Sequence, residues 1–261
     1  MQENKVKLQF YKYQAAGNDF VVIDNRGRNI HLSAEQIYRL CDRRFGVGAD
    51  GVILVADDAQ KDYHVTYYNP DGTQSLCGNG CRSAVEFARR LGLASEHSVF
   101  AAYDGDHFAD ILPNGLIRIK MNDLNHIDRV LDGYYMDTGS PHFVRFVTGL
   151  SGYPVFEEGR KIRYDKVFPI GANANFIEPI DRHTLSLRTY ERGVEQETLA
   201  CGTGATASAI AASLEGYQSP VTLKARGGDL IIDFVKQEDG SFTGIHMTGP
   251  ASMVFTGVIE L

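Results

Sequence analysis

The sequence lacks long apolar runs and any surplus of basic charge. Its longest aliphatic stretch, Val52–Ala56, is far too short to span a bilayer. Polar and charged side chains interrupt the opening MQENKVKLQFYKYQ, so it does not resemble the apolar core of a signal peptide. The net charge of −7 argues against nucleic acid or an anionic membrane as the main partner. We therefore expect a cytoplasmic protein that acts on a small molecule.

Cysteine is also scarce, with four residues in the chain: Cys41, Cys77, Cys81 and Cys201. Because the cytosol is reducing, we expect no structural disulfide, and each thiol serves either packing or chemistry. Cys77 and Cys81 have the spacing of zinc ligands, but Cys41 and Cys201 have no paired ligand beside them. A metal site is therefore not favoured. Cys41 and Cys81 are interpreted as packing residues, since a lone buried cysteine usually behaves as a small hydrophobe.

Signatures of the common cofactors are missing as well. We find no phosphate-binding loop, and residues 46–51 match the dinucleotide glycine pattern only as letters. No clean strand and helix flank this segment, so we interpret it as a turn. The expected cofactor and metal content is therefore none.

The 261 residues contain an internal repeat. Motifs of the first half recur in the same order, 122 to 124 positions later. The matching segments are 16–22 with 138–144, 48–53 with 171–176, 66–69 with 188–191, and 77–80 with 201–204. Such constant spacing indicates a duplicated chain. We predict an N-terminal lobe of residues 1–121 plus 250–261 carrying Cys77, and a C-terminal lobe of residues 122–249 carrying Cys201.

Local patterns predict what each lobe contains. Apolar residues of 81–91 have helical spacing and end at Gly92, a typical C-terminal cap. Residues 205–214 are apolar nearly all round, which predicts a buried helix. Segments such as 115–121 and 229–235 alternate as strands do. The predicted fold class is α/β of the α+β type: two pseudo-symmetric lobes, each a curved, mainly antiparallel sheet around a central helix.

Cys77 and Cys201 each precede a Gly-x-Gly turn that leads into a helix. A helix start offers unpaired N–H groups and partial positive charge, which suit a carboxylate and favour a thiolate. Inversion of an α-carbon needs a base on one face and an acid on the other, and a thiolate with a thiol supplies both. The N–H groups would stabilise the enediolate-like charge that otherwise needs a cofactor. The alternative is two tight structural turns with incidental thiols.

Seven segments together resemble the diaminopimelate epimerase family over nearly the whole chain. They are 17–20 (GNDF), 69–72 (NPDG), 77–80 (CGNG), 141–142 (PH), Asn173, 190–193 (YERG) and 197–204 (ETLACGTG). The glutamate–arginine motif before a second cysteine motif is highly specific. Proline and hydroxyproline racemases share the two-cysteine logic, but their first motif usually has His where this chain has Asn79.

The resemblance implies Cys77 and Cys201 as the acid–base pair. Residues that would hold the reacting amino-acid head are Gly78, Asn79, Gly202 and Thr203. Residues that would bind the distal amino-acid end are Asn18, Asn69, Asn173 and Arg192.

Among these, Arg192 would grip the distal carboxylate with two hydrogen bonds. Glu191 would face the substrate ammonium, and with His142 it would help set the protonation of the thiols. For His142 the alternative is a hydrogen-bonded loop histidine. Turn or cap roles are expected for Asp19, Asp71 and Glu197.

Two positions depart from the family pattern. Ser140 stands where an Asn often precedes Pro-His, and Gly51 stands where some members have Gln. Both changes concern the distal end, so they bear on substrate range more than on reaction type.

The predicted function is the cofactor-independent interconversion of LL- and meso-diaminopimelate, which serves lysine and peptidoglycan precursor synthesis. A homodimer is the expected assembly. The alternatives are another two-cysteine racemase, such as a proline or hydroxyproline epimerase, and a redox-switched thiol protein that pairs Cys77 with Cys201.

Overall fold

The computed structural model describes residues 7–75 and 77–261. Contacts within the chain divide it into two compact units, Met1–Ile119 with Pro250–Leu261, and Lys120–Gly249. The lobes predicted from the sequence have their boundaries at 121/122 and 249/250.

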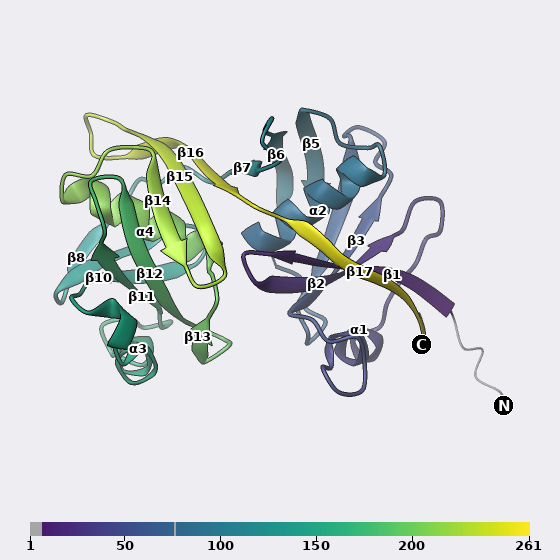
Figure 1. Cartoon of the computed structure of the whole chain (residues 1–261), viewed down its shortest axis with the longest axis horizontal. Coiled ribbons are helices and arrows are strands. Elements are labelled where there is room, and N and C mark those ends of the chain that lie inside the picture. The colour runs from purple at the N-terminus through teal and green to yellow at the C-terminus, as the bar shows by residue number, and fades with distance from the viewer. Residues whose placement is uncertain (1–6, 76) are drawn as a thin grey trace. The chain divides into compact units, whose positions relative to one another are not determined.

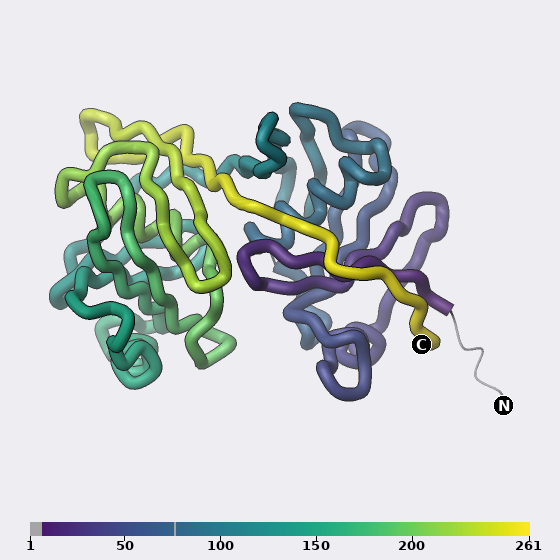
Figure 2. The backbone as a smooth tube through the Cα atoms, viewed as in Figure 1, coloured from purple at the N-terminus to yellow at the C-terminus, as the bar shows by residue number. Residues whose placement is uncertain are grey.

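The N-terminal unit is built on a sheet with the strand order β17–β1–β2–β3–β4–β5–β6–β7. Neighbouring strands are antiparallel except for β2–β3 and β4–β5, which are parallel. The bounds are β1 (Lys7–Ala15), β2 (Asn18–Asp24), β3 (Gly51–Ala56), β4 (Tyr63–Tyr68), β5 (His97–Ala102), β6 (Gly105–Ile111), β7 (Ile117–Lys120) and β17 (Ser252–Glu260). Figure 2 shows β17, at the yellow end of the chain, running beside the purple β1.

The C-terminal unit has the order β8–β9–β10–β11–β12–β14–β15–β16, with β13 paired to β12. Only β10–β11 and β12–β14 are parallel pairs in it. The bounds are β8 (Asp128–Val130), β9 (Gly133–Asp137), β10 (Pro141–Phe146), β11 (Asn173–Pro179), β12 (Thr184–Glu191), β13 (Gln196–Thr198), β14 (Val221–Ala225), β15 (Gly228–Lys236) and β16 (Phe242–Gly249). The succession of parallel and antiparallel pairs is therefore the same in both units.

The strand registers show the repeat residue by residue. Phe20 is paired with Gly51 in the N-terminal unit, and His142, 122 positions later, is paired with Asn173 in the C-terminal unit. The pair Val52–Tyr68 is matched in the same way by 174–190. The predicted fold class, two similar lobes of mainly antiparallel sheet around a helix, is confirmed.

Each sheet curves around one central helix (Figure 1). The helix α2 (Gly78–Arg90) packs on β1, β2, β3, β4 and β17, and α4 (Gly202–Leu214) packs on β9–β12 and β14–β16. Gly92 follows α2 with a φ of 77°, as predicted for a C-terminal cap. Most of α4 is buried, because its small side chains let strands approach on every side. Both helices begin earlier than the apolar periodicity suggests, because the glycine turns form their first residues.

Shorter helices cover the opposite face of each sheet. These are α1 (Ala34–Cys41), with a capping box between Ser33 and Gln36, and α3 (Val155–Arg163), preceded by the short η1 (Leu150–Gly152). Phe143 and Phe176 pack with α3. Because side chains alternate along a strand, His142 and Asn175 lie on the other face, toward α4. In the described part of the chain, no helix is long and apolar enough to cross a membrane.

Candidate active site

Cys77 is the N-cap residue of α2. Its backbone is extended, with φ −126° and ψ 113°, and its Sγ accepts a hydrogen bond of 3.5 Å from the Gly80 N–H. The helix ladder begins with the Cys81 N–H, which donates to the Cys77 carbonyl at 2.7 Å. The N–H groups of Gly78 and Asn79 are therefore not used by the ladder, and the helix start is positively polarised beside the sulfur.

A chain of side-chain amides passes the Cys77 sulfur. Asn18 Oδ1 lies 3.6 Å from Sγ and accepts from Asn79 Nδ2 at 3.3 Å. Arg82 donates to Asn79 Oδ1 at 2.6 Å, and Asn18 donates to Asp50 at 2.5 Å. Arg82 can only donate and an ionised Asp50 can only accept, so the two ends fix the orientation of both amides. Burial lowers the pKa of Arg82 to about 10, which leaves it charged at neutral pH.

Asp19 does not have the turn role expected from the sequence. It lies on β2 and forms ion pairs with Lys12 at 2.6 Å and Arg43 at 2.7 Å. Burial alone would raise the pKa of Asp19, but hydrogen bonds from Arg43 and Lys12 outweigh it and hold the pKa at about 2. Arg43 also contacts Asp50 at 2.8 Å. This ion-pair cluster therefore supports the residue that orients Asn18.

Glu197 likewise departs from its expected cap role. It lies on β13 and forms ion pairs with Arg188 at 2.7 Å and with Arg226 at 3.1 Å. Asp71 does have the predicted turn role, since its Oδ1 accepts from the Thr73 N–H at 2.9 Å. Charged neighbours from other segments of the chain decided the first two cases, and local sequence decided the third.

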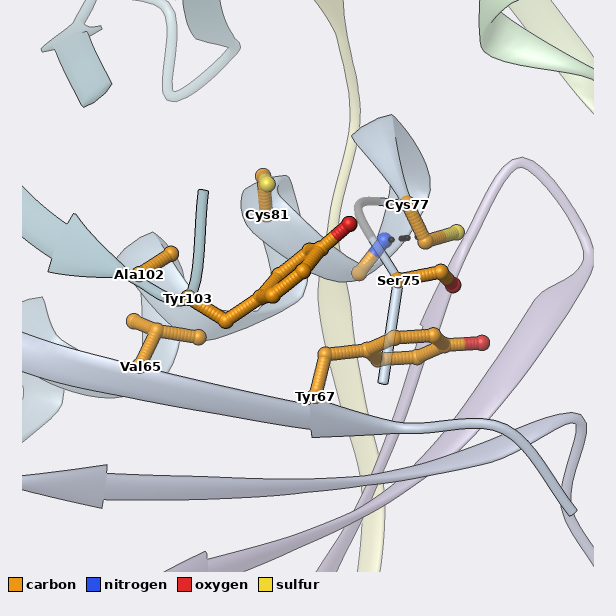
Figure 3. A pocket seen from close by; sticks show the side chains of 8 residues that line it. Val65, Tyr67, Ser75, Cys77, Cys81, Ala102 and Tyr103 are labelled. Atoms are coloured by element: carbon orange, nitrogen blue, oxygen red, sulfur yellow. Dashed lines mark hydrogen bonds between the residues drawn. The ribbon is translucent and has the colours of Figure 1, made fainter. Parts of the chain in front are cut away.

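Asn69 follows β4 directly. It donates to Thr73 Oγ1 at 3.0 Å and accepts from Ser75 Oγ at 3.1 Å. Figure 3 shows Ser75, Tyr67 and Cys77 gathered at one side of a small pocket. Asn69 is thus tied to the loop that leads to Cys77.

Cys81 lines the same pocket as Cys77, but its sulfur points in a different direction (Figure 3). Burial raises the pKa of Cys81 far above the range in which a thiol ionises in neutral solution, and it raises the pKa of Cys41 to about 11. Such thiols are poor nucleophiles and poor bases. Within the described ranges, no group of three or more His, Cys, Asp or Glu could hold a metal ion.

Cys201 occupies the matching position in the C-terminal unit. It is the N-cap of α4, with φ −122° and ψ 115°, nearly the backbone conformation of Cys77. The ladder again begins one turn later, where the Ala205 N–H donates to the Cys201 carbonyl at 2.9 Å. The N–H groups of Gly202 and Thr203 therefore lie at an open helix start as well.

Thr203 joins Cys201 to a buried histidine. Its Oγ1 lies 3.5 Å from Cys201 Sγ and 2.8 Å from His142 Nε2. Ser140 Oγ is 2.9 Å from the same nitrogen and 3.4 Å from Thr203 Oγ1. His142 thus reaches the sulfur through a hydroxyl group, and Ser140 is part of this cluster.

His142 is fully buried on β10, so the loop interpretation is wrong. Burial lowers the pKa of His142 to about 3, and the positive charge of Arg192 is a second, smaller cause of this shift. Asn175 Nδ2 lies 3.0 Å from its Nδ1. The imidazole is therefore neutral at physiological pH, and the Thr203 hydroxyl lies between it and the Cys201 sulfur.

The end of β12 presents a carboxylate and a guanidinium side by side. Glu191 accepts from Thr198 Oγ1 at 2.8 Å. The Arg192 N–H donates to Asn173 Oδ1 at 2.8 Å, and its Nη1 donates to the Ile170 carbonyl at 3.1 Å. Among the described residues, no carboxylate forms an ion pair with Arg192. Its two-pronged donor face is thus available for a carboxylate ligand.

Asn173 donates both of its amide hydrogens within the unit, to Ser140 Oγ at 3.2 Å and to the Pro141 carbonyl at 2.9 Å. Its Oδ1 has one remaining lone pair after the bond from Arg192. It therefore positions Arg192 and can offer only an acceptor to a ligand.

Each unit thus collects its own share of the predicted residues. The N-terminal unit joins Cys77, Asn79 and Asn18, and the C-terminal unit joins Cys201, Thr203 and His142. Sequence reasoning missed Asp50, Arg82 and Asn175. Only Asn175 carries a sequence signal, since it lies two residues from Asn173 on a strand and so shares its face.

Comparison with known proteins decides the family. The sequence pattern described as diaminopimelate epimerase matches residues 10–127 and 134–254. A diaminopimelate epimerase of Flavobacterium psychrophilum is 44% identical, covering 97% of this chain and 100% of that protein. One of Chlorobaculum tepidum is 39% identical, covering 94% and 99%.

The chain belongs to the diaminopimelate epimerase family. It is accordingly an isomerase.

Solved structures of low sequence identity share the fold of this family. A phenazine biosynthesis protein of the PhzF family from Bacillus anthracis has a TM-score of 0.75 at 17% identity, covering 98% of this chain and 100% of that one. A hydroxyproline epimerase from Agrobacterium vitis has a TM-score of 0.68 at 12% identity, covering 100% and 93%.

Proposed function

We propose that this chain interconverts LL- and meso-diaminopimelate with Cys77 and Cys201 as its acid–base pair. One thiolate removes the α-proton, and the electron pair left on the carbon spreads into the carboxylate. The other thiol then donates its proton to the opposite face, so one thiolate and one thiol remain with their roles exchanged. The single observation that carries the proposal is that both cysteines are N-caps of equivalent helices in the two repeats.

In the N-terminal unit, we assign the N–H groups of Gly78 and Asn79 to the α-carboxylate, where they stabilise the developing negative charge. Asn18 and Asn69 would contact the distal amino-acid end. Each uses one amide hydrogen within the chain, so each retains one donor for the substrate.

In the C-terminal unit, Gly202 and Thr203 have the corresponding role toward the reacting head. Arg192 would hold the distal carboxylate through two parallel hydrogen bonds. Glu191 and the remaining lone pair of Asn173 Oδ1 are acceptors, which suits a substrate ammonium group. Charge complementarity with a substrate that has an amino-acid group at each end supports this assignment.

Exchange of α-protons in heavy water tests the function. We expect deuterium to enter diaminopimelate, but neither proline nor hydroxyproline, because these lack a second amino-acid end for Arg192. Cys77→Ala and Cys201→Ala should each abolish epimerisation. The matched controls Cys41→Ala and Cys81→Ala should retain it. Exchange into proline alone, or full activity of Cys77→Ala, would contradict the proposal.

We place this activity in the cytoplasm, in lysine and peptidoglycan precursor synthesis. The reason is that both reacting thiols must stay reduced, and a reducing compartment keeps them so. The expected homodimer stays a prediction, which light scattering of the purified protein would test.

A further inference from the structure

His142 is held from behind by a second buried amide, Asn175 on β11. Asn175 Nδ2 donates to the Phe143 carbonyl at 3.0 Å, and its Oδ1 accepts from Thr189 Oγ1 at 2.9 Å. A backbone carbonyl can only accept, so Nδ2 and not Oδ1 must face it. The amide orientation is thereby determined. The side chains of Asn175 and Thr189 are fully or almost fully buried.

This orientation determines where the imidazole carries its proton. Nδ2 lies 3.0 Å from His142 Nδ1 and can only donate, so Nδ1 must be the unprotonated acceptor. A neutral ring then carries its proton on Nε2. An Nε2–H cannot accept, so neither Ser140 nor Thr203 can donate to the ring.

The hydroxyl protons must therefore point elsewhere. Ser140 Oγ already accepts from Asn173 at 3.2 Å and lies 2.9 Å from the donor Nε2, so it is a poor acceptor for a third proton. The acceptor that remains for the Thr203 proton is Cys201 Sγ, 3.5 Å away. A hydroxyl that donates to sulfur stabilises the thiolate form.

The internal repeat offers an independent comparison. The positions of the N-terminal unit that match His142, Asn175 and Thr189 by register are Phe20, Ile53 and Tyr67. Phe20 and Ile53 are fully buried, and the Phe20 and Tyr67 rings make an edge contact with centroids 6.0 Å apart. At these three positions the N-terminal unit thus has mainly apolar side chains, and the C-terminal unit has a polar network. Because buried polar groups cost free energy unless they are satisfied, the network needs a reason other than folding.

Gly204 provides the space for this network. A β-carbon there would lie 2.4 Å from Asn175 Oδ1 and 3.3 Å from His142 Cε1. The last glycine of the Cys-Gly-Thr-Gly motif therefore lets the first turn of α4 lie directly on the amide and the imidazole.

We propose that Asn175, supported by Thr189, is a positioning residue that holds His142 in the Nε2–H tautomer and so directs the Thr203 hydroxyl proton to Cys201 Sγ. This inference rests on the proposed function of Cys201, and it adds two residues that act on that thiol without touching the substrate. Cys77, whose Sγ faces the amide oxygen of Asn18, has a different hydrogen-bond environment.

The decisive variant is Asn175→Asp, which places an acceptor where the donor stands. The ring should change to the Nδ1–H tautomer, and Nε2 would then accept the Thr203 proton and draw it away from the sulfur. Nitrogen-15 chemical shifts of the His142 ring in the full-length protein distinguish the two tautomers. We expect kcat to fall by about 10-fold to 100-fold, the range known for loss of the hydrogen-bond partner of a metal-ligating histidine. Alkylation of Cys201 by iodoacetamide at pH 8 should slow several-fold.

A second pair of variants keeps the test decisive if Asn175→Asp does not fold. Thr189→Val should lower both kcat and Cys201 alkylation by a few-fold, and Thr189→Ser should restore both. Thr248→Val removes another buried threonine hydroxyl of the same unit and should change neither. A wild-type His142 found as Nδ1–H or as imidazolium at pH 7 would overturn the inference. Unchanged reactivity of Cys201 in a folded Asn175→Asp variant would also overturn it. If Asn175→Asp does not fold, unchanged reactivity of Cys201 in Thr189→Val would do the same.

The two proposals can fail separately. If the wild-type protein does not exchange the α-proton of diaminopimelate, the proposed function is wrong. The ring spectra and the alkylation of Cys201 need no substrate, so they still judge the roles of Asn175 and Thr189.

Discussion

The phenol ring of Tyr67 lies directly against Gly51, where a β-carbon would come within 2.6 Å of the ring. The two residues belong to the neighbouring strands β4 and β3. Tyr67 also lines the pocket that contains Cys77. The glycine that departs from the family pattern is therefore required by the tyrosine packed on it.

Gly51→Ala should consequently destabilise the N-terminal unit. A methyl group at 2.6 Å cannot fit without displacing the ring, and overpacking of this kind costs about 1–3 kcal/mol. Gly152→Ala is the control, because a β-carbon there meets no atom within 4 Å. Urea unfolding of the two variants measures the difference, and equal stability would show that Tyr67 moves aside freely.

Arg192→Lys should lower kcat/KM for LL-diaminopimelate by at least ~10-fold. Lysine keeps the charge but loses the planar pair of donors that matches a carboxylate. Arg28→Lys, at an exposed position, should leave the kinetics unchanged. If Arg192→Lys were silent, the distal carboxylate would be bound elsewhere, and the choice of diaminopimelate would lose its main physical support.

Asp19→Asn should destabilise the protein at neutral pH, by on the order of 1–2 kcal/mol. The pKa of Asp19 is lowered from its ordinary value of 3.8 to about 2 in the folded state. Its contribution is thus fully present above pH 3.8 and is lost as the pH falls through 2. The stabilities of wild type and variant should therefore converge in acid. A constant difference from pH 7 to pH 2 would mean that the carboxylate charge is not responsible.

Native Cys41 and Cys81 should resist alkylation at pH 8, whereas the partly exposed Cys77 should react readily. Burial raises the pKa of both packing thiols, so the reactive thiolate is almost absent at this pH. Mass spectrometry after a timed iodoacetamide pulse locates the labels, and unfolding in urea should make all four cysteines react. Fast labelling of Cys81 in the folded protein would contradict its assignment as a packing residue.

The sequence by itself determined the duplication, the two helices that start at a cysteine, and the strand periodicity. All of these depend on local patterns, such as a glycine turn before an apolar helix. It also indicated Cys77 and Cys201, because their placement recurs at a constant spacing. Asp71 was predicted correctly as a turn residue because its partner is also local: Thr73 lies two residues away.

Only the tertiary structure decided which side chains surround each thiol. Thr203 meets His142 across 61 residues, and Asn18 meets Cys77 across 59. A local sequence pattern cannot reveal contacts between residues so far apart in the chain, because strand pairing and helix packing bring these residues together. Asp19 and Glu197 were misassigned on this account, since their arginine partners come from other segments of the chain. The tautomer of His142 is likewise a property of the folded unit, because it depends on a carbonyl, an amide and a hydroxyl that three strand positions bring together.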